Sequence, residues 1–206
     1  KIKLKKNYYR VFNLMLLKSY SKINLTLKVN KKLKKDNLHN IQSYYSLINL
    51  HDKIQIKIIN GTKDLIRFNG KFAKYVSKSK NSIQTTLDIL RKRNILNNYF
   101  SILIEKNIPV FAGLGGGTSN SVFLTKYFVK NNINENLKNI LTKKIGSDFR
   151  LFFHKQGFVQ KLHKIYKFNK KYKLNFVLVY PNIRCSTRIM YSKIKRYSPK
   201  LNFDHK

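Results

Sequence analysis

The stretch Ala112-Gly113-Leu114-Gly115-Gly116-Gly117-Thr118-Ser119-Asn120 decides how this 206-residue chain is interpreted. Its four glycines permit positive φ and let backbone N–H groups approach an anion closely. Residues 99–106 before it predict a strand, and Pro109 lies in the short lead into the glycines. Residues 121–130 predict a helix that begins near 118–120, where unpaired N–H groups and the helix dipole favour negative charge. This order of elements predicts a phosphate-binding loop.

The polar residues behind the glycines strengthen that prediction. Thr118 and Ser119 carry hydroxyls that can bind a phosphate oxygen or a magnesium ion, whereas a glycine run alone is also typical of a flexible turn. The Walker loop requires a lysine directly before the hydroxyl residue, where Gly117 stands. The dinucleotide fingerprint expects an acidic residue about 20 positions further on in a parallel unit, and Glu135 lies in a different context. Both of those loops are excluded.

Transfer of a phosphoryl group to an alcohol needs a group that takes or orients the hydroxyl proton. Asp148 stands out among the eight acidic residues because it follows Gly146, a helix-ending glycine, and precedes an apolar segment. Alone, it would be a helix cap or a surface ion-pair partner; with the glycine loop it becomes a catalytic candidate. The other seven are expected in lysine-rich polar surroundings: Asp36, Asp52, Asp64, Asp88, Glu105, Glu135 and Asp204.

The remaining sequence predicts an α+β fold, with strands first and helices around the glycine loop. Ile23, Leu25, Leu27 and Val29 alternate as in a half-buried strand, with Lys22, Asn24, Thr26 and Lys28 on its other face. Further strands are predicted at residues 41–50, 53–59, 151–159 and 174–180, the last well buried. Helices are predicted at residues 82–93, capped by Asn81 or Ser82, and at 135–145, ended by Gly146. The basic stretch 161–173 predicts a linker between two lobes.

The charge of the chain points first to nucleic acid. There are 44 basic and 8 acidic residues, a formal net charge of +36, and a basic surface gains affinity by releasing counterions from phosphates. However, the excess is 36 lysines against 8 arginines, whereas base-edge recognition favours arginine. Lysine, asparagine and isoleucine also share A/T-rich codons. A nucleotide substrate fits the same charge, so direct nucleic-acid binding is the less favoured interpretation.

Other site classes receive no support from the sequence. Cys185 is the only cysteine, so an intramolecular disulfide and a four-thiolate zinc site are excluded. The histidines show no H-E-x-x-H spacing, and no structural metal is predicted. No run approaches the roughly 18–20 apolar residues that a membrane span needs.

The motif order resembles the superfamily of galactokinase, homoserine, mevalonate and phosphomevalonate kinases, and within it the family of 4-diphosphocytidyl-2-C-methyl-D-erythritol kinases. The resemblance runs from about Ser19 to Tyr191. It is carried by Ser21-Lys22-Ile23-Asn24-Leu25, similar to Ala-Lys-(Ile/Leu)-Asn-Leu; Asp36-Asn37-Leu38-His39, similar to Asp-Gly-Tyr-His; residues 113–120, similar to Gly-Leu-Gly-Gly-Gly-Ser-Ser-Asn; Gly146-Ser147-Asp148-Phe149, similar to Gly-Ala-Asp-Val; and residues 181–191.

The resemblance implies a two-lobed small-molecule kinase whose N-terminal lobe is like a ribosomal-protein domain. It implies ATP-dependent phosphorylation of the 2-hydroxyl of the cytidyl-erythritol substrate in the non-mevalonate isoprenoid pathway, with ATP and Mg²⁺ as cofactors. Asp148 is then the base or hydroxyl-orienting group, and Lys22 keeps it ionised and stabilises charge on the transferring phosphoryl group. Asn24, His39 and Tyr191 would hold the substrate, the last two at its cytosine. ATP would be bound by Asn81, near the adenine, and by Pro109, Gly113, Leu114, Gly115, Gly116, Gly117, Thr118, Ser119 and Asn120.

The domain prediction is an upstream extension at residues 1–14, an ATP-binding lobe at 15–160, and a linker with the start of an incomplete C-terminal lobe at 161–206. Two residues depart from the family pattern: Leu38 replaces a tyrosine expected to stack on cytosine, and Arg150 replaces a proline beside Asp148. Two alternatives stay open, a kinase of another small alcohol, favoured by Leu38, and a basic RNA-binding module. The cytoplasm is the expected compartment, with a plastid as the alternative.

Overall fold

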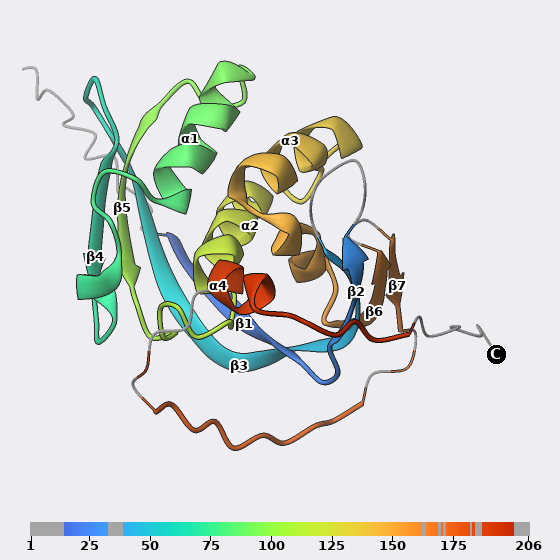
Figure 1. The fold of residues 1–206 in the computed structure, drawn as a ribbon. Coiled ribbons are helices and arrows are strands. Elements are labelled where there is room, and N and C mark those ends of the chain that lie inside the picture. Colours follow the sequence, from blue (N-terminus) through green and yellow to red (C-terminus); the bar gives the residue numbers. More distant parts are fainter. Residues whose placement is uncertain are drawn as a thin grey trace, which may run out of the picture.

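The computed structural model of the chain describes residues 15–32, 39–161, 164–168, 170, 172–181, 183 and 187–199. A seven-stranded sheet carries three helices side by side on one face: α1 (Ser82–Lys92), α2 (Gly116–Phe128) and α3 (Glu135–Ile145) (Figure 1). Strands supply most of the first part of the chain and helices follow, so the predicted α+β class is confirmed.

The long strand β3 (His39–Ile59) is the centre of the sheet. β1 (Met15–Asn24) runs antiparallel along one of its edges, and β5 (Tyr99–Glu105) pairs with the other. The two strands predicted at 41–50 and 53–59 are therefore one strand. The rest of the sheet comprises β2 (Lys28–Lys32), antiparallel to the start of β3; β4 (Leu65–Asn69), parallel to β5; β6 (Gln156–Lys161), antiparallel to β3; and β7 (Lys164–Lys167), antiparallel to β6.

The main core lies between the sheet and the three helices. Ile54 of β3 and Ile102 and Ile104 of β5 are fully buried, as are Leu87 of α1 and Leu124 of α2. Full burial of such a side chain stabilises the fold by about 1.5–3 kcal/mol. This packing fixes the N-terminal ends of α1 and α2 relative to the sheet.

The helix predictions for 82–93 and 135–145 are confirmed, and side-chain caps explain where these helices begin. The Asn81 side chain accepts a hydrogen bond from the Gln84 backbone N–H, and the Asn134 side chain accepts one from Leu137. Such caps satisfy N–H groups that have no partner within the helix. The helix predicted after the glycine loop starts earlier than expected, at Gly116, and therefore takes two of the glycines into its first turn.

The predicted alternation along the first strand is only partly correct. β1 ends at Asn24, and Leu25 and Leu27 beyond it are 43% and 44% exposed, whereas Lys22 is 4% exposed. The register between β1 and β3 shifts after Tyr20, which breaks the two-residue alternation at this point. Burial of Lys22 is possible because its ammonium has polar partners, described below.

Two strand predictions in the C-terminal part are wrong. Residues 147–153 form a short 3₁₀ helix, η2 (Ser147–Phe153), so the strand predicted at 151–159 begins only at Gln156. Part of the predicted linker is strand β7. Residues 174–180 form no helix or strand, and Val177 and Val179 are 92% and 86% exposed. Their apolar pattern is that of a strand, but the part of the chain that the structure describes offers them no sheet partner.

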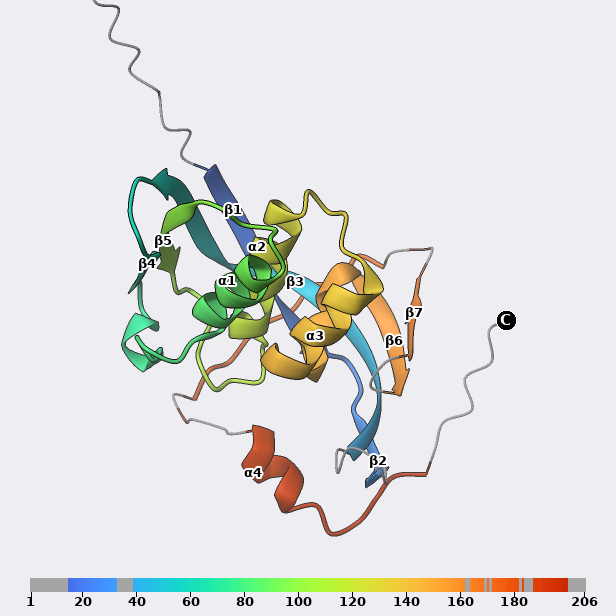
Figure 2. The ribbon, with the colours of Figure 1, turned by 90° about the horizontal axis from the view of Figure 1, so that it is seen from above.

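The segment 172–181 passes outside the sheet from the β7 side and leads toward α4 (Thr187–Ser192) (Figure 1). Its start is held by the Gln156 side-chain amide, which makes hydrogen bonds of 2.7 and 2.9 Å to the Tyr172 backbone. Its end packs Tyr180 edge-on against Phe72, beside the short 3₁₀ helix η1 (Ala73–Tyr75). Seen from above, α4 lies apart from the three sheet-covering helices (Figure 2). None of the described helices is both long and apolar enough to cross a membrane.

Candidate functional site

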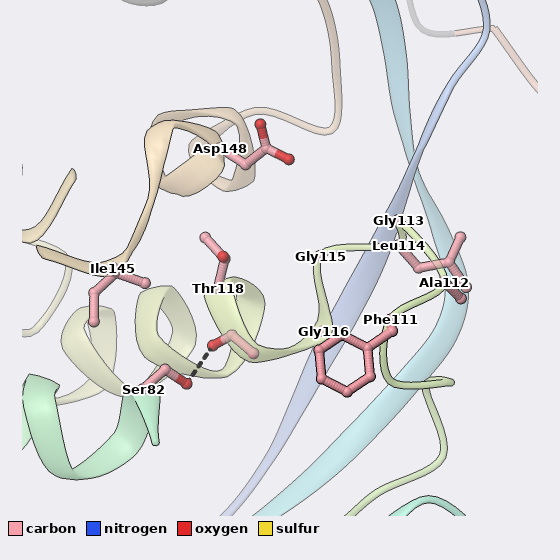
Figure 3. A pocket seen from close by; sticks show the side chains of 11 residues that line it. Ser82, Phe111, Ala112, Gly113, Leu114, Gly115, Gly116, Thr118, Ile145 and Asp148 are labelled. Carbon is pink, nitrogen blue, oxygen red and sulfur yellow. Dashed lines mark hydrogen bonds between the residues drawn. The ribbon is translucent and has the colours of Figure 1, made fainter. Parts of the chain in front are cut away.

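A pocket of about 330 Å³ opens over the glycine loop. Its floor is the continuous run Phe111-Ala112-Gly113-Leu114-Gly115-Gly116-Gly117-Thr118, and its walls are Ser82 of α1, Ile145 at the end of α3 and Asp148 of η2 (Figure 3). Among the described residues that line this pocket, Asp148 is the one acidic side chain. The loop, the first turn of α2 and a carboxylate therefore share one cavity.

The loop enters α2 through Gly115, which has φ of +70° and is the residue that caps the helix. The N–H groups in the first turn of a helix lack intrahelical partners, and a cap without a side chain leaves them accessible from the pocket. Ser82 fixes the start of α2 against α1, because its Oγ donates a 2.8 Å hydrogen bond to the Gly117 carbonyl, the dashed line in Figure 3. This geometry is typical of sites that bind an anion.

Replacing Gly115 with alanine is expected to weaken nucleotide binding by about tenfold or more. A Cβ atom at Gly115 would lie 2.8 Å from the Phe152 ring, and the positive φ adds backbone strain. Gly113→Ala is the matched control, since Gly113 also has a positive φ of +72° but a Cβ there meets no atom within 4 Å. Calorimetric titration with ADP measures both. Equal losses in the two variants would show that the contact with Phe152 plays no part.

A buried ion pair lies beneath the loop. Asp52 is fully buried; it accepts a hydrogen bond from the ammonium of Lys106 and 2.8 Å bonds from the backbone N–H groups of Asn107 and Ile108. Burial lowers the pKa of Lys106, and the charge of Asp52 opposes this shift. A Cβ atom at Gly116 would come within 3.3 Å of the Lys106 nitrogen, so the ammonium sits directly under the loop.

The structure encloses the carboxylates of Asp52 and Asp64, for which the sequence predicts lysine-rich polar surroundings. Asp52 is enclosed with Lys106, and Asp64, whose side chain is 2% exposed, makes two hydrogen bonds to the Arg91 guanidinium. The sequence shows only the neighbouring lysines, whereas both ion-pair partners come from distant positions, 54 and 27 residues away. Such pairing is visible only in three dimensions.

Asp148 is joined to the first strand by Lys22. The Lys22 Nζ lies 3.2 Å from Asp148 Oδ2 and donates a 3.1 Å hydrogen bond to Asn24 Oδ1. The backbone N–H of Lys22 donates a 3.0 Å bond to the Leu114 carbonyl in the glycine loop. The side chain of Lys22 is 5% exposed and that of Asp148 is 34% exposed. The carboxylate is thus oriented by a buried ammonium while one part of it remains open to the pocket.

His39 and Tyr191, far apart in the sequence, lie together. Their rings stack at 5.6 Å between centroids, with an interplanar angle of 28°. Burial raises the pKa of Tyr191, and the negative charge of Asp148 adds to the shift. Tyr191 therefore links the surroundings of Asp148 to the aromatic contact at His39.

The predicted site residues divide into three groups. Gly113 to Thr118 and Asp148 line the pocket, and Lys22 and Asn24 support Asp148. Asn81 lines an adjoining pocket of about 370 Å³ that shares Ser82 and Ile145 with the first. Pro109, Ser119 and Asn120 do not line either pocket: Ser119 Oγ turns inward to Ser19 Oγ at 2.7 Å and Tyr20 O at 2.5 Å, and Asn120 is 2% exposed.

Several features lie beyond the sequence predictions. Ser82, Phe111 and Ile145 line the pocket but were not predicted to do so. Ser82 was recognised only as a possible helix cap, since nothing in the sequence shows that α1 packs its first turn against α2. Within the described ranges no three His, Cys, Asp or Glu side chains gather as a metal cluster. The departure at Leu38 falls outside the described residues.

Comparison with known proteins agrees with this geometry. Residues 80–149 match the family model described as the GHMP kinases N terminal domain. The chain is 39% identical over 192 residues to the 4-diphosphocytidyl-2-C-methyl-D-erythritol kinase of Pelagibacter ubique, covering 90% of this chain and 67% of that protein. It is 31% identical over 186 residues to the kinase of the same name from Ureaplasma parvum, covering 87% and 69%.

A solved structure shows the same fold. The crystal structure of a 4-(cytidine 5'-diphospho)-2C-methyl-D-erythritol kinase superimposes with a TM-score of 0.65 at 19% identity, over 91% of this chain and 68% of that one. The sequence matches cover most of this chain and about two thirds of the relatives' length. The chain therefore belongs to the family of 4-diphosphocytidyl-2-C-methyl-D-erythritol kinases, within the GHMP kinases.

Proposed function

We propose that the chain transfers the γ-phosphoryl group of ATP to the 2-hydroxyl of 4-diphosphocytidyl-2-C-methyl-D-erythritol. GHMP kinases use ATP as co-substrate, and the names of the relatives give the acceptor. One observation carries the proposal: the Lys22–Asp148 ion pair stands at the wall of the pocket whose floor is the glycine loop. A phosphate donor on the loop and an alcohol at Asp148 would meet in that cavity.

In the proposed reaction the acceptor oxygen forms a bond to the γ-phosphorus while the bond to the β–γ bridging oxygen breaks and ADP leaves. Asp148 orients the acceptor hydroxyl and takes its proton. Lys22 holds the carboxylate in position and places positive charge beside the transferring group, as electrostatic stabilisation of phosphoryl transfer requires. The N–H groups of the first α2 turn bind the phosphates of the donor.

The remaining assignments follow the same division of the site. Asn81 lies in the adjoining pocket, which suits the adenosine of ATP, and Asn24, His39 and Tyr191 lie on the acceptor side of Asp148. Pro109, Ser119 and Asn120 support the loop from behind instead of contacting the nucleotide. We assign the described residues 15–160 to the ATP-binding lobe, and residues from 161 onward to the connection and the acceptor side.

Mg²⁺ fits the donor set of this pocket. Magnesium is bound in kinases by one or two carboxylates together with substrate phosphates and retained waters. Asp148 supplies a carboxylate and Thr118 a hydroxyl, and both residues line this pocket (Figure 3). When bound, the ion would neutralise charge on the β- and γ-phosphates.

The compartment of the protein, the cytoplasm with a plastid as the alternative, stays a prediction.

The test is ATP turnover with the cytidyl-erythritol substrate against a panel of other small alcohols. Selective turnover that EDTA abolishes and excess magnesium restores is the expected result. If only a different alcohol is phosphorylated, that alcohol is the acceptor and the cytidyl-erythritol assignment is wrong. Absence of turnover on every alcohol, combined with RNA binding in physiological salt, would overturn the kinase and favour the basic binding module.

A further inference from the structure

The end of the described chain is attached to β2. The backbone N–H of Ser198 donates a 2.9 Å hydrogen bond to Val29 O, and the Asn30 side chain donates a 2.8 Å bond to Ser198 O. Asn30 is 4% exposed, so this polar contact is enclosed. Both polar backbone groups of Ser198 are thereby engaged. These two hydrogen bonds of Ser198 also fix the position of the preceding residue, Tyr197, in addition to its own packing.

Tyr197 lies against His39, the same imidazole that Tyr191 contacts. The Tyr197 and His39 ring centroids are 5.7 Å apart, with an interplanar angle of 37°. Tyr197 is 41% exposed, so part of its ring is uncovered. His39 Nδ1 is buried and has no hydrogen-bond partner among the residues that the structure describes. Starting at Asp148, the acceptor side therefore continues through Tyr191 and His39 to a second tyrosine ring.

Two tyrosine rings around an imidazole suit a planar, nitrogen-containing ring. Aromatic side chains bind a nucleobase by stacking on its face, and a histidine adds hydrogen bonding at its edge. A simple sugar alcohol offers no such face, whereas a pyrimidine does. The residue directly before His39 in the sequence is leucine and brings no aromatic ring, whereas Tyr197 brings one to His39.

We propose that Tyr197 is a specificity-determining residue that packs against the pyrimidine of a cytidine-diphosphate-linked acceptor. The inference rests on the proposed function for the identity of the acceptor. Tyr197 acts on acceptor binding and not on the proton or the phosphoryl group, since its ring contacts His39. If Tyr197 had only a structural role, its replacement would lower stability and weaken the binding of all ligands alike. A selective effect on the binding of the pyrimidine ligand therefore distinguishes the two roles.

The experiment is calorimetric titration of the whole chain with CDP and, separately, with ADP. Tyr197→Leu is expected to weaken CDP binding about tenfold, because one stacked base face is lost, and to leave ADP binding unchanged. Tyr197→Phe keeps the ring and should bind CDP as the parent does. Tyr180→Leu is the matched control, since Tyr180 belongs to the same C-terminal part and packs on Phe72 instead of His39.

Three results would overturn the inference: a parent chain that does not bind CDP, Tyr197→Leu that binds CDP as tightly as the parent, or parallel losses for CDP and ADP. Turnover measured on the same preparations tests the proposed function separately. If the parent chain phosphorylates the cytidyl substrate but Tyr197→Leu binds CDP as tightly as the parent, only the role of Tyr197 is rejected. If Tyr197→Leu weakens CDP binding but the parent chain transfers no phosphoryl group, only the kinase assignment is rejected.

Discussion

Replacing Asp148 with asparagine is expected to lower turnover by roughly 10²–10⁴-fold, the range typical for loss of a positioned acid or base. Asparagine keeps the size of the side chain but cannot accept the proton of the acceptor hydroxyl. The Asp148 side chain is 34% exposed, so the fold should tolerate the change. The measurement is kcat at saturating ATP and acceptor, with the thermal midpoint recorded on the same sample.

Two companion variants sharpen this test. Glu105→Gln removes a carboxylate from a surface pair with Lys53, away from the pocket, and should leave kcat unchanged. Lys22→Met removes the ammonium that orients Asp148 and should lower kcat in the same direction. A kcat for Asp148→Asn within a factor of about three of the parent value would remove Asp148 from the proposed mechanism.

Replacing Asp52 with alanine is expected to lower the free energy of unfolding by about 3–5 kcal/mol, the usual effect of removing one partner of a buried ion pair. The Lys106 ammonium would remain enclosed without its carboxylate, and the N–H groups of Asn107 and Ile108 would lose their acceptor. Urea unfolding followed by circular dichroism measures the change. The glycine loop rests on this pair, so ADP binding should weaken as well.

The double variant Asp52→Ala/Lys106→Met separates the buried charge from the packing. Since an apolar replacement of a whole buried pair is often close to neutral, the second change should restore part of the lost stability. Glu105→Ala, which breaks the exposed pair with Lys53, should cost far less than Asp52→Ala. Equal losses at Asp52 and Glu105 would contradict the structural importance of the buried pair.

The parts of the fold that were predictable from sequence are those that short-range signals specify. The cap at Asn81, the helix-ending Gly146 and the helical spacing of apolar residues place α1 and α3 within a residue or two. The lining of the pocket was predictable for a different reason: hydroxyl residues follow the glycine run directly, and few carboxylates compete with Asp148. The structure then places Lys22 beside Asp148, although 126 residues separate them in the chain.

The errors concern features that depend on distant partners. The strand β4 was not predicted, because its partly buried residues acquire a role only when β5 lies parallel beside it. Residues 174–180 have a strong strand pattern but find no partner strand among the described residues, and so remain exposed. The burial of Asp52 was not predicted, because composition shows only the neighbours in sequence, whereas burial depends on neighbours in space.

The attachment of Ser198 to β2 also bears on how the site assembles. The bond from Asn30 to Ser198 joins residues 168 positions apart. Closing so large a loop costs conformational entropy that grows with the logarithm of its length, and contacts of this range form slowly. The core between the sheet and α1–α3 consists of shorter-range contacts and is expected to form first. During refolding, nucleotide binding should therefore recover before CDP binding, because the aromatic end of the site waits for the C-terminal residues to reach β2.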